Sequence, residues 1–159
     1  MEPRIDYTAV SPRAVTALMG LERHVRASGI ESALLELVKL RASQVNGCAY
    51  CIDMHAKDAR AAGESEQRLY ALTAWRETPF YTLRERAALA WADALTRIAD
   101  GGVPEGLFDH ARDHFTEAEL VDLTLAVVAI NGWNRLAISF RTPPGSYRPS
   151  RLRADALEG

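Results

Sequence analysis

A single long apolar segment near the C-terminus, residues 120–140, restricts the fold more than any other feature of this sequence. Its first half, up to Ile130, has apolar side chains around most of its circumference, so a helix formed here needs cover on all sides. Four polar or charged side chains interrupt the segment: Asp122, Asn131, Asn134 and Arg135. A lipid bilayer disfavours such groups, so we expect a buried helix in a helical bundle and not a membrane span.

Helix signals divide the remaining sequence, and no segment has a convincing strand pattern. Capping boxes, in which side chains at both ends of the first turn bind free backbone N–H groups, begin at Thr82 and Thr116. Gly47 and Gly63 end two other helices. The expected helices cover residues 11–29, 32–46, 48–63, 65–75, 82–99, 105–115 and 116–140. The sequence therefore predicts an all-α, single-domain helical bundle.

Length and charge narrow the class of protein further. The 159 residues fit one compact domain, which we assign to residues 1–140. Residues 141–159 are a Pro- and Arg-rich C-terminal tail that we expect to lack regular structure. The net charge of −2 argues against a nucleic-acid binder, which usually presents a clearly basic surface. Residues 1–10 contain charges and lack the apolar core of a signal peptide, so the expected location is the cytoplasm.

The motif that points to chemistry is Cys48-Ala-Tyr-Cys51. Two cysteines do not make a secreted disulfide framework, and in a reducing compartment this spacing indicates redox chemistry or metal binding. Gly47 places Cys48 at or near a helix N-terminus, where free N–H groups and the helix dipole favour a thiolate. Cα atoms three residues apart on a helix are roughly 5 Å apart, so a reversible disulfide within the helix is feasible.

Glu36 and His55 are the residues expected to assist the cysteines. His55 lies on the same helical face as both of them. If the helices on either side of Gly47 fold back as a hairpin, a rise of roughly 1.5 Å per residue brings Glu36 level with His55. This order suggests a relay in which Glu36 and His55 remove the proton of Cys51, directly or through water. The apolar neighbours of Glu36 predict a raised pKa, in the range of a general base.

Residues 36–55 resemble the alkyl-hydroperoxidase D branch of the carboxymuconolactone decarboxylase family. The pattern of that branch is Glu, eleven residues, Cys-x-x-Cys, three residues and His, and this sequence matches it at every defined position. Residues 59–63, 88–93 and 131–135 extend the resemblance to about residues 7–140. The resemblance implies a bundle of the alkyl-hydroperoxidase D type. The implied activity is thiol-dependent reduction of hydrogen peroxide or organic hydroperoxides, as in antioxidant defence.

The resemblance also implies a role for each site residue. Cys51 would be the peroxidatic cysteine, Cys48 would resolve it by forming the disulfide, and Glu36 and His55 would be the proton relay. No metal, haem or flavin is implied. The partners would be a dithiol reductant, such as a lipoyl-bearing adaptor or a thioredoxin-like protein, and further copies of the chain in a homotrimer or homohexamer. Tyr50 stands where the founding branch has histidine, which leaves an additional proton-transfer role at this position unsupported.

Other functions remain open from the sequence. One is a decarboxylase-like enzyme, which is disfavoured because the decarboxylases of the family lack the cysteine pair. Another is a dithiol–disulfide oxidoreductase. A non-enzymatic redox-sensing oligomer is a further alternative. Zinc binding would need a fourth ligand beyond the motif. The remaining histidines, in no recognisable zinc-finger spacing and expected at the surface, are His24, His110 and His114. Polar residues that either satisfy one another or line the active-site mouth are Ser43, Gln44, Asn131, Asn134 and Arg135.

Overall fold

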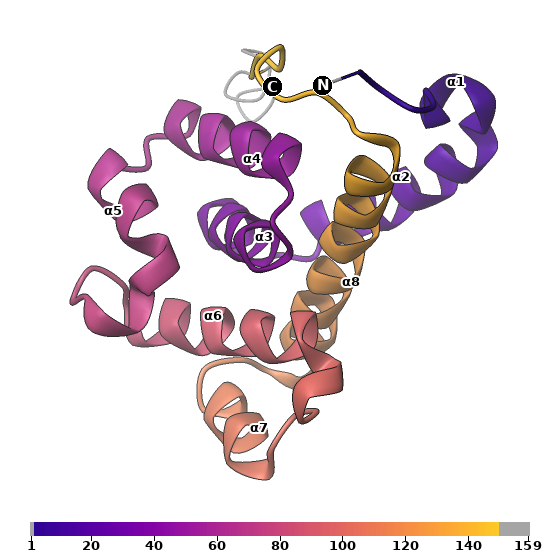
Figure 1. Ribbon diagram of the computed structural model, residues 1–159. Helices are drawn as coiled ribbons and strands as arrows, with labels where there is room; N and C mark the ends of the chain where they lie inside the picture. Colours follow the sequence, from indigo (N-terminus) through magenta and orange to yellow (C-terminus); the bar gives the residue numbers. More distant parts are fainter. Residues whose placement is uncertain (1, 150–159) are drawn as a thin grey trace, which may run out of the picture.

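The computed structural model describes residues 2–149, and these form eight α-helices and two short 3₁₀ helices (Figure 1). The described residues contain no strand, so the all-α prediction is confirmed. The α-helices are α1 (Tyr7–Val10), α2 (Pro12–Arg26), α3 (Ser32–Asn46), α4 (Ala49–Ala61), α5 (Glu66–Ala71), α6 (Leu83–Thr96), α7 (Glu105–Arg112) and α8 (Glu117–Phe140). The 3₁₀ helices are η1 (Leu72–Glu77) and η2 (Ile98–Asp100).

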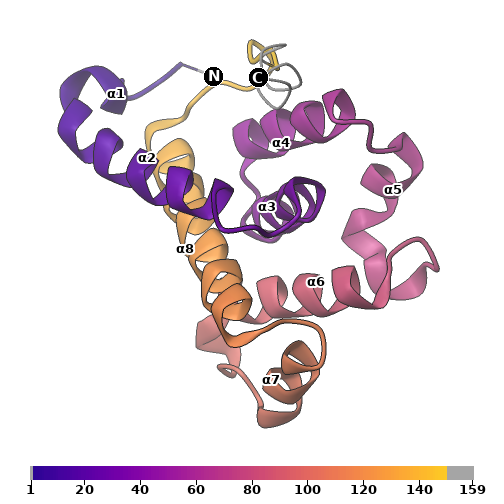
Figure 2. The same cartoon turned by 180° about the vertical axis from the view of Figure 1, so that it is seen from behind.

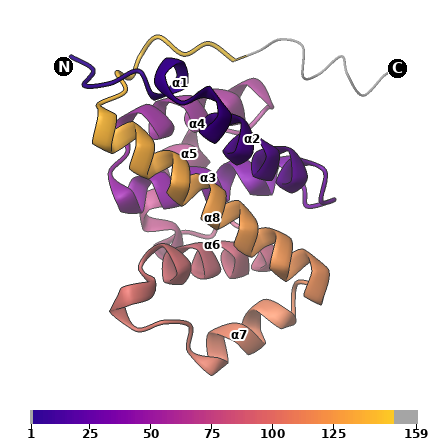
Figure 3. The same cartoon turned by 90° about the vertical axis from the view of Figure 1, so that its right-hand side faces the viewer.

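Helix α3 lies in the middle of the bundle and contacts α4, α6 and α8 (Figure 1). From the side, α1, α2 and α4 lie on one side of α3, and α6 and α7 lie on the other (Figure 3). The view from behind shows α2 lying across α8, with which it also packs (Figure 2). The hairpin formed by α3 and α4 is therefore held in place by the rest of the bundle.

The central position of α3 explains why residues 34–43 are buried without interruption, charged side chains included. Lys39 forms a salt bridge with Glu22 of α2. The Nε atom of Arg41 lies 2.6 Å from the Oδ1 atom of Asp93 on α6. Buried charges persist in folded proteins when they are paired in this way, because an unpaired buried charge is strongly destabilising.

Helix α8 begins at the predicted capping box and is long and apolar enough to cross a membrane by length and composition alone. It is instead a bundle helix, since Leu123, Ala126 and Ile130 are buried against the neighbouring helices. Its outer face remains open in the single chain, where Val121 is 60% and Val128 is 53% exposed. The chain therefore covers only part of its most apolar helix.

The helices differ from the sequence prediction in several places. The opening segment contains α1, because the side chain of Asp6 accepts hydrogen bonds from the N–H groups of Thr8 and Ala9. The helix expected over residues 65–75 is divided into α5 and η1, and η1 is itself kinked at Ala74. The helix expected to reach residue 99 ends at Thr96 and is followed by η2.

The chain leaves α8 through Arg141, whose φ of 56° reverses its direction. Residues 142–149 then run back over α4 without helix or strand, as expected for the tail (Figures 1 and 2). Residues 150–159 of the assigned tail lie outside the described residues.

Candidate active site

The cysteine pair lies at the turn between α3 and α4. Gly47 has a φ of 69°, a left-handed conformation that suits glycine, and Cys48 is the N-cap residue of α4. Both cysteines are 1% exposed, and their thiols are hydrogen-bonded with the sulfur atoms 2.7 Å apart. A disulfide has an S–S distance of roughly 2.05 Å, so the two sulfur atoms already lie close to bonding distance.

The two thiols have opposite pKa shifts. The hydrogen bond from the Cys51 thiol lowers the pKa of Cys48 to about 7 against the effect of burial, helped by Asn134 and by the N–H groups of Cys51 and Tyr50. The same hydrogen bond and burial raise the pKa of Cys51. When the pair loses one proton, the charge therefore rests on Cys48, as the helix N-terminus predicts.

Glu36 and His55 contact each other, as predicted from the rise per residue along the two helices of the hairpin. The Oε2 atom of Glu36 lies 2.7 Å from the Nδ1 atom of His55, and both side chains are buried. The predicted rise in the pKa of Glu36 is wrong. Burial does raise it, but the hydrogen bond to His55 and the charges of His55, Lys39 and Arg26 outweigh burial and lower the pKa.

The lowered pKa of Glu36 fixes the tautomer of His55. A carboxylate only accepts hydrogen bonds, so the Nδ1 atom of His55 must donate to it. The Nε2 atom is then the ring nitrogen that can take up a proton. Glu36 thus orients the His55 ring, and His55 is the candidate base of the pair.

A chain of charges behind Glu36 was not predicted from the sequence. Arg26 has its Nη2 atom 3.9 Å from Glu36 Oε1 and its Nε atom 3.1 Å from Glu22 Oε1. Glu22 in turn forms a salt bridge with the buried Lys39. A signal was present, since Glu22 and Arg26 are one turn apart on α2, and Lys39 follows Glu36 by one turn on α3.

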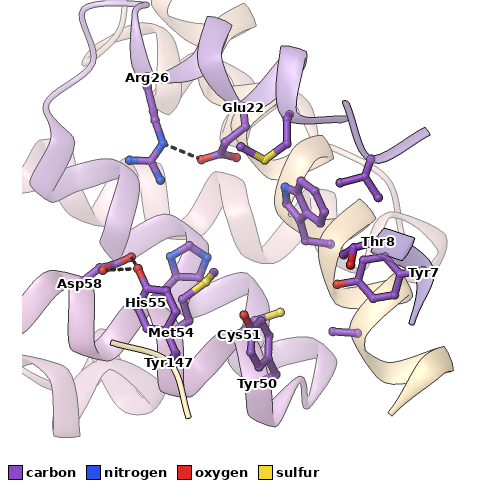
Figure 4. A pocket seen from close by; sticks show the side chains of 14 residues that line it. Tyr7, Thr8, Glu22, Arg26, Tyr50, Cys51, Met54, His55, Asp58 and Tyr147 are labelled. Carbon is purple, nitrogen blue, oxygen red and sulfur yellow. Dashed lines mark hydrogen bonds and ion pairs between the residues drawn. The ribbon is translucent and has the colours of Figure 1, made fainter. Parts of the chain in front are cut away.

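A cavity of about 330 Å³ opens beside Cys51 (Figure 4). Cys51 and His55 line it, whereas Cys48 does not, so a small molecule in the cavity meets Cys51. Among the described residues, no direct hydrogen bond joins the Cys51 thiol to the His55 ring. Of the two routes considered for the relay, direct transfer lacks a hydrogen bond, and the arrangement favours transfer through water. Most of the other lining residues are apolar or aromatic: Tyr7, Val15, Met19, Tyr50, Met54, Trp133, Ala137 and Tyr147.

The sequence left two roles open for several polar residues, namely hydrogen bonding to one another or lining the mouth of the active site. Most of them form hydrogen bonds with one another. The Nδ2 atom of Asn46 donates to Asn131 Oδ1 at 2.9 Å and to Asn134 Oδ1 at 2.8 Å. Asn134 donates to the hydroxyl of Ser43 at 3.1 Å. Asn134 also lowers the pKa of Cys48, so this residue supports the cysteine pair as well as the packing of α8. Arg135 donates to Asn131.

One group of described residues has the donor atoms for a metal ion: Glu36, His55 and Asp58, with one ligand atom from each within 4.8 Å of the others. Glu36 and His55 already bind each other, and the cation of Arg26 lies close to Glu36. The two cysteines take no part in this group. Of the spare histidines, His24 lies on the surface and pairs with an aspartate of α8.

Comparisons with known proteins bear on the family and the fold. Residues 11–94 match the model of the carboxymuconolactone decarboxylase family. The uncharacterized protein YdfG of Bacillus subtilis is 43% identical over 139 residues, which are 87% of this chain and 95% of that protein.

Two solved structures show the same fold. ATU0492 of Agrobacterium tumefaciens is a protein of unknown function that has been suggested to be the antioxidant defence protein AhpD. It is 47% identical, with a TM-score of 0.89 over 92% of this chain and 100% of that chain. The debrominase Bmp8 is 21% identical, with a TM-score of 0.78 over 87% of this chain and 75% of that chain, and shares the fold alone.

Proposed function

The chain belongs to the carboxymuconolactone decarboxylase family, in its alkyl-hydroperoxidase D-like branch, and we propose that it is a thiol-dependent peroxidase of antioxidant defence. The observation that carries the proposal is the position of Cys51. Cys51 lines the cavity together with His55, and the sulfur of Cys48 lies 2.7 Å from the sulfur of Cys51. A candidate nucleophile, a candidate base and a resolving thiol are thus gathered at one cavity.

The first step oxidises Cys51. Its proton passes to the Nε2 atom of His55 through water, and the sulfur attacks the distal oxygen of the hydroperoxide. The O–O bond breaks, the departing alkoxide takes the proton back from His55, and an alcohol leaves; with hydrogen peroxide the product is water. Cys51 becomes a sulfenic acid. Glu36 stabilises the protonated His55 during this transfer.

The second step forms the disulfide. The thiolate of Cys48, which the N–H groups of Cys51 and Tyr50 and the Asn134 side chain stabilise, attacks the sulfur of the sulfenic acid. An S–S bond forms, the S–O bond breaks, and the hydroxide leaves as water after taking up a proton. An external dithiol, such as a lipoyl-bearing adaptor or a thioredoxin-like protein, then returns both thiols to the reduced state by exchange. The cytoplasm, where thiols are kept reduced, suits this cycle.

A peroxidase assay with dihydrolipoamide, thioredoxin and dithiothreitol side by side tests the proposal. We expect peroxide-dependent oxidation of at least one of these dithiols, at a rate proportional to enzyme concentration. A single oxidation of the cysteines without turnover would instead indicate a sensor. Decarboxylase activity that survives the loss of both cysteines would indicate the decarboxylase alternative.

We predict that the purified protein contains no stoichiometric metal. The three possible ligands are held in other interactions: Glu36 with His55, and Asp58 with the hydroxyl of Tyr147 at 2.8 Å. The nearby cation of Arg26 further disfavours a bound cation. Elemental analysis of protein purified without chelator measures this. One zinc per chain, lost when both cysteines are replaced, would contradict the prediction and the peroxidase proposal.

We predict a homo-oligomer, a trimer or a hexamer built from trimers. Val121 and Val128 are two turns apart on the open face of α8, and both are more than half exposed in the single chain. Light scattering behind a sizing column should therefore show one multimeric species. Val128→Asp should shift it to smaller species, whereas Val10→Asp, a matched change at a side chain that is 74% exposed on α1, should not. A stable wild-type monomer at micromolar concentration would rule out the oligomer.

A further inference from the structure

The described part of the tail is fastened to the outer side of α4. The N–H group of Gly145 donates to Asp53 Oδ2 at 3.0 Å. The Nζ atom of Lys57 donates to the carbonyl oxygens of Gly145 at 3.3 Å and Tyr147 at 3.2 Å. Asp53 and Lys57 are one turn apart and also pair with each other at 2.8 Å. Residues 142–149 therefore have a defined path, and we call them the strap.

The strap carries Tyr147 into the cavity. The hydroxyl of Tyr147 donates to the carboxylate of Asp58, 2.8 Å from Oδ1 and 3.0 Å from Oδ2. Both residues line the cavity together with His55. Figure 4 shows Tyr147, Asp58 and His55 grouped at one end of the cavity, with Tyr7 at the other end. The Tyr147 ring thus forms the wall of the cavity next to His55, the proposed base.

Tyr147 is positioned differently from the other residues that line the cavity. Most lining side chains project from helices that pack in the bundle, whereas Tyr147 belongs to a segment without helix or strand. Its position depends on the hydrogen bonds to Asp53, Lys57 and Asp58. The cavity of about 330 Å³ is near the lower end of the volumes typical of ligand pockets. The ring of Tyr147 therefore limits the space at the end of the cavity next to His55.

We propose that Tyr147 is a specificity-determining residue, which the strap holds in place to restrict access to Cys51 to compact, apolar organic hydroperoxides. This inference rests on the proposed peroxidase function for its substrate class. The charged lining side chains are paired within the protein, Arg26 with Glu22 and Glu36 and Asp58 with Tyr147. Most of the other lining side chains are apolar or aromatic, which favours an aryl or short alkyl group over a charged one. A long acyl chain would need the space that the Tyr147 ring occupies.

Thiol labelling tests access to Cys51 without any need for peroxidase activity. In a Cys48→Ser background, the labelling rate of Cys51 is measured with methyl methanethiosulfonate, a small reagent, and with fluorescein maleimide, a bulky one. Tyr147→Ala should raise the ratio of the bulky rate to the small rate about tenfold, because it removes a ring from the pocket wall. Tyr147→Phe keeps the ring and loses the hydrogen bond to Asp58, so we expect a rise of roughly threefold.

Tyr70→Ala is the matched control, because Tyr70 is 75% exposed and lies outside this cavity. A ratio in Tyr147→Ala equal to that of the control would overturn the inference. An equal increase for both reagents would overturn it too, since it would mean general loosening of the fold.

The second measurement concerns the substrate. Tyr147→Ala should raise kcat/KM for a fatty-acid hydroperoxide relative to cumene hydroperoxide about tenfold. An unchanged preference in an active enzyme would overturn the substrate claim. Absence of turnover in the wild type would refute the proposed function, and the labelling ratio would still decide whether Tyr147 controls access.

Discussion

Cys51→Ser should abolish peroxide turnover, whereas Cys48→Ser should complete one oxidation and stop at the sulfenic acid. Cys51 is the cysteine that lines the cavity, so it is the one that a hydroperoxide reaches. Without Cys48 the oxidised sulfur has no partner at 2.7 Å with which to form a disulfide. Trapping with a sulfenic-acid reagent, followed by mass spectrometry of each variant, measures the outcome.

The pKa values make this a strict test of the two roles. Cys48 has the lowered pKa, of about 7, and an assignment based on acidity alone would make it the nucleophile. Position and acidity therefore predict opposite results. A sulfenic acid found on Cys48 of the Cys51→Ser variant, and none on Cys51 of the Cys48→Ser variant, would reverse the assignment.

The pH dependence of thiolate formation, followed by the ultraviolet absorbance of the thiolate, provides a further check. A lowered pKa means that the Cys48 thiolate forms at lower pH, so the thiolate absorbance of the wild type should rise with pH around a midpoint near 7. The largest cause of the lowering is the hydrogen bond from Cys51. Replacing Cys51 with alanine should therefore move the midpoint upward, toward that of an ordinary thiol. An unchanged midpoint would mean that the helix N-terminus alone lowers the pKa.

The sequence predicted the hairpin of the site because its signals are local. Gly47 marks the end of α3, and a constant rise per residue along each helix places Glu36 opposite His55 without any knowledge of the rest of the fold. The capping boxes at Thr82 and Thr116 are likewise contained within single turns, and both are present.

Features that depend on packing between distant segments could not be predicted. Arg26 lies next to Glu36 only because α2 crosses the bundle beside α3, and no local pattern sets that crossing. The predicted pKa shift of Glu36 was wrong for the same reason, since burial was visible in the sequence and the neighbouring charges were not. Tyr147 follows Asp58 by 89 residues, so its hydrogen bond was also beyond local reasoning.

Replacing His55 with alanine should lower kcat/KM for hydroperoxide by about 10²–10⁴-fold, the usual cost of losing one general base. Its Nε2 atom takes up the proton of Cys51 in the proposed first step, and alanine offers no substitute. Glu36→Gln should have a smaller effect in the same direction. The amide oxygen can still accept the hydrogen bond from Nδ1, but it lacks the charge that stabilises the protonated ring.

The controls separate loss of the base from loss of the fold. His110→Ala and Glu117→Gln remove the same groups from exposed positions and should leave kcat/KM unchanged. Thermal unfolding of all four variants shows whether the buried substitutions disturb the bundle. The pH profile is the decisive measurement, because removing a group that merely packs changes the rate without altering the shape of the profile. If His55→Ala kept the wild-type rate and pH profile, the relay would be excluded, and Cys48 would be left as the group that takes the proton from Cys51.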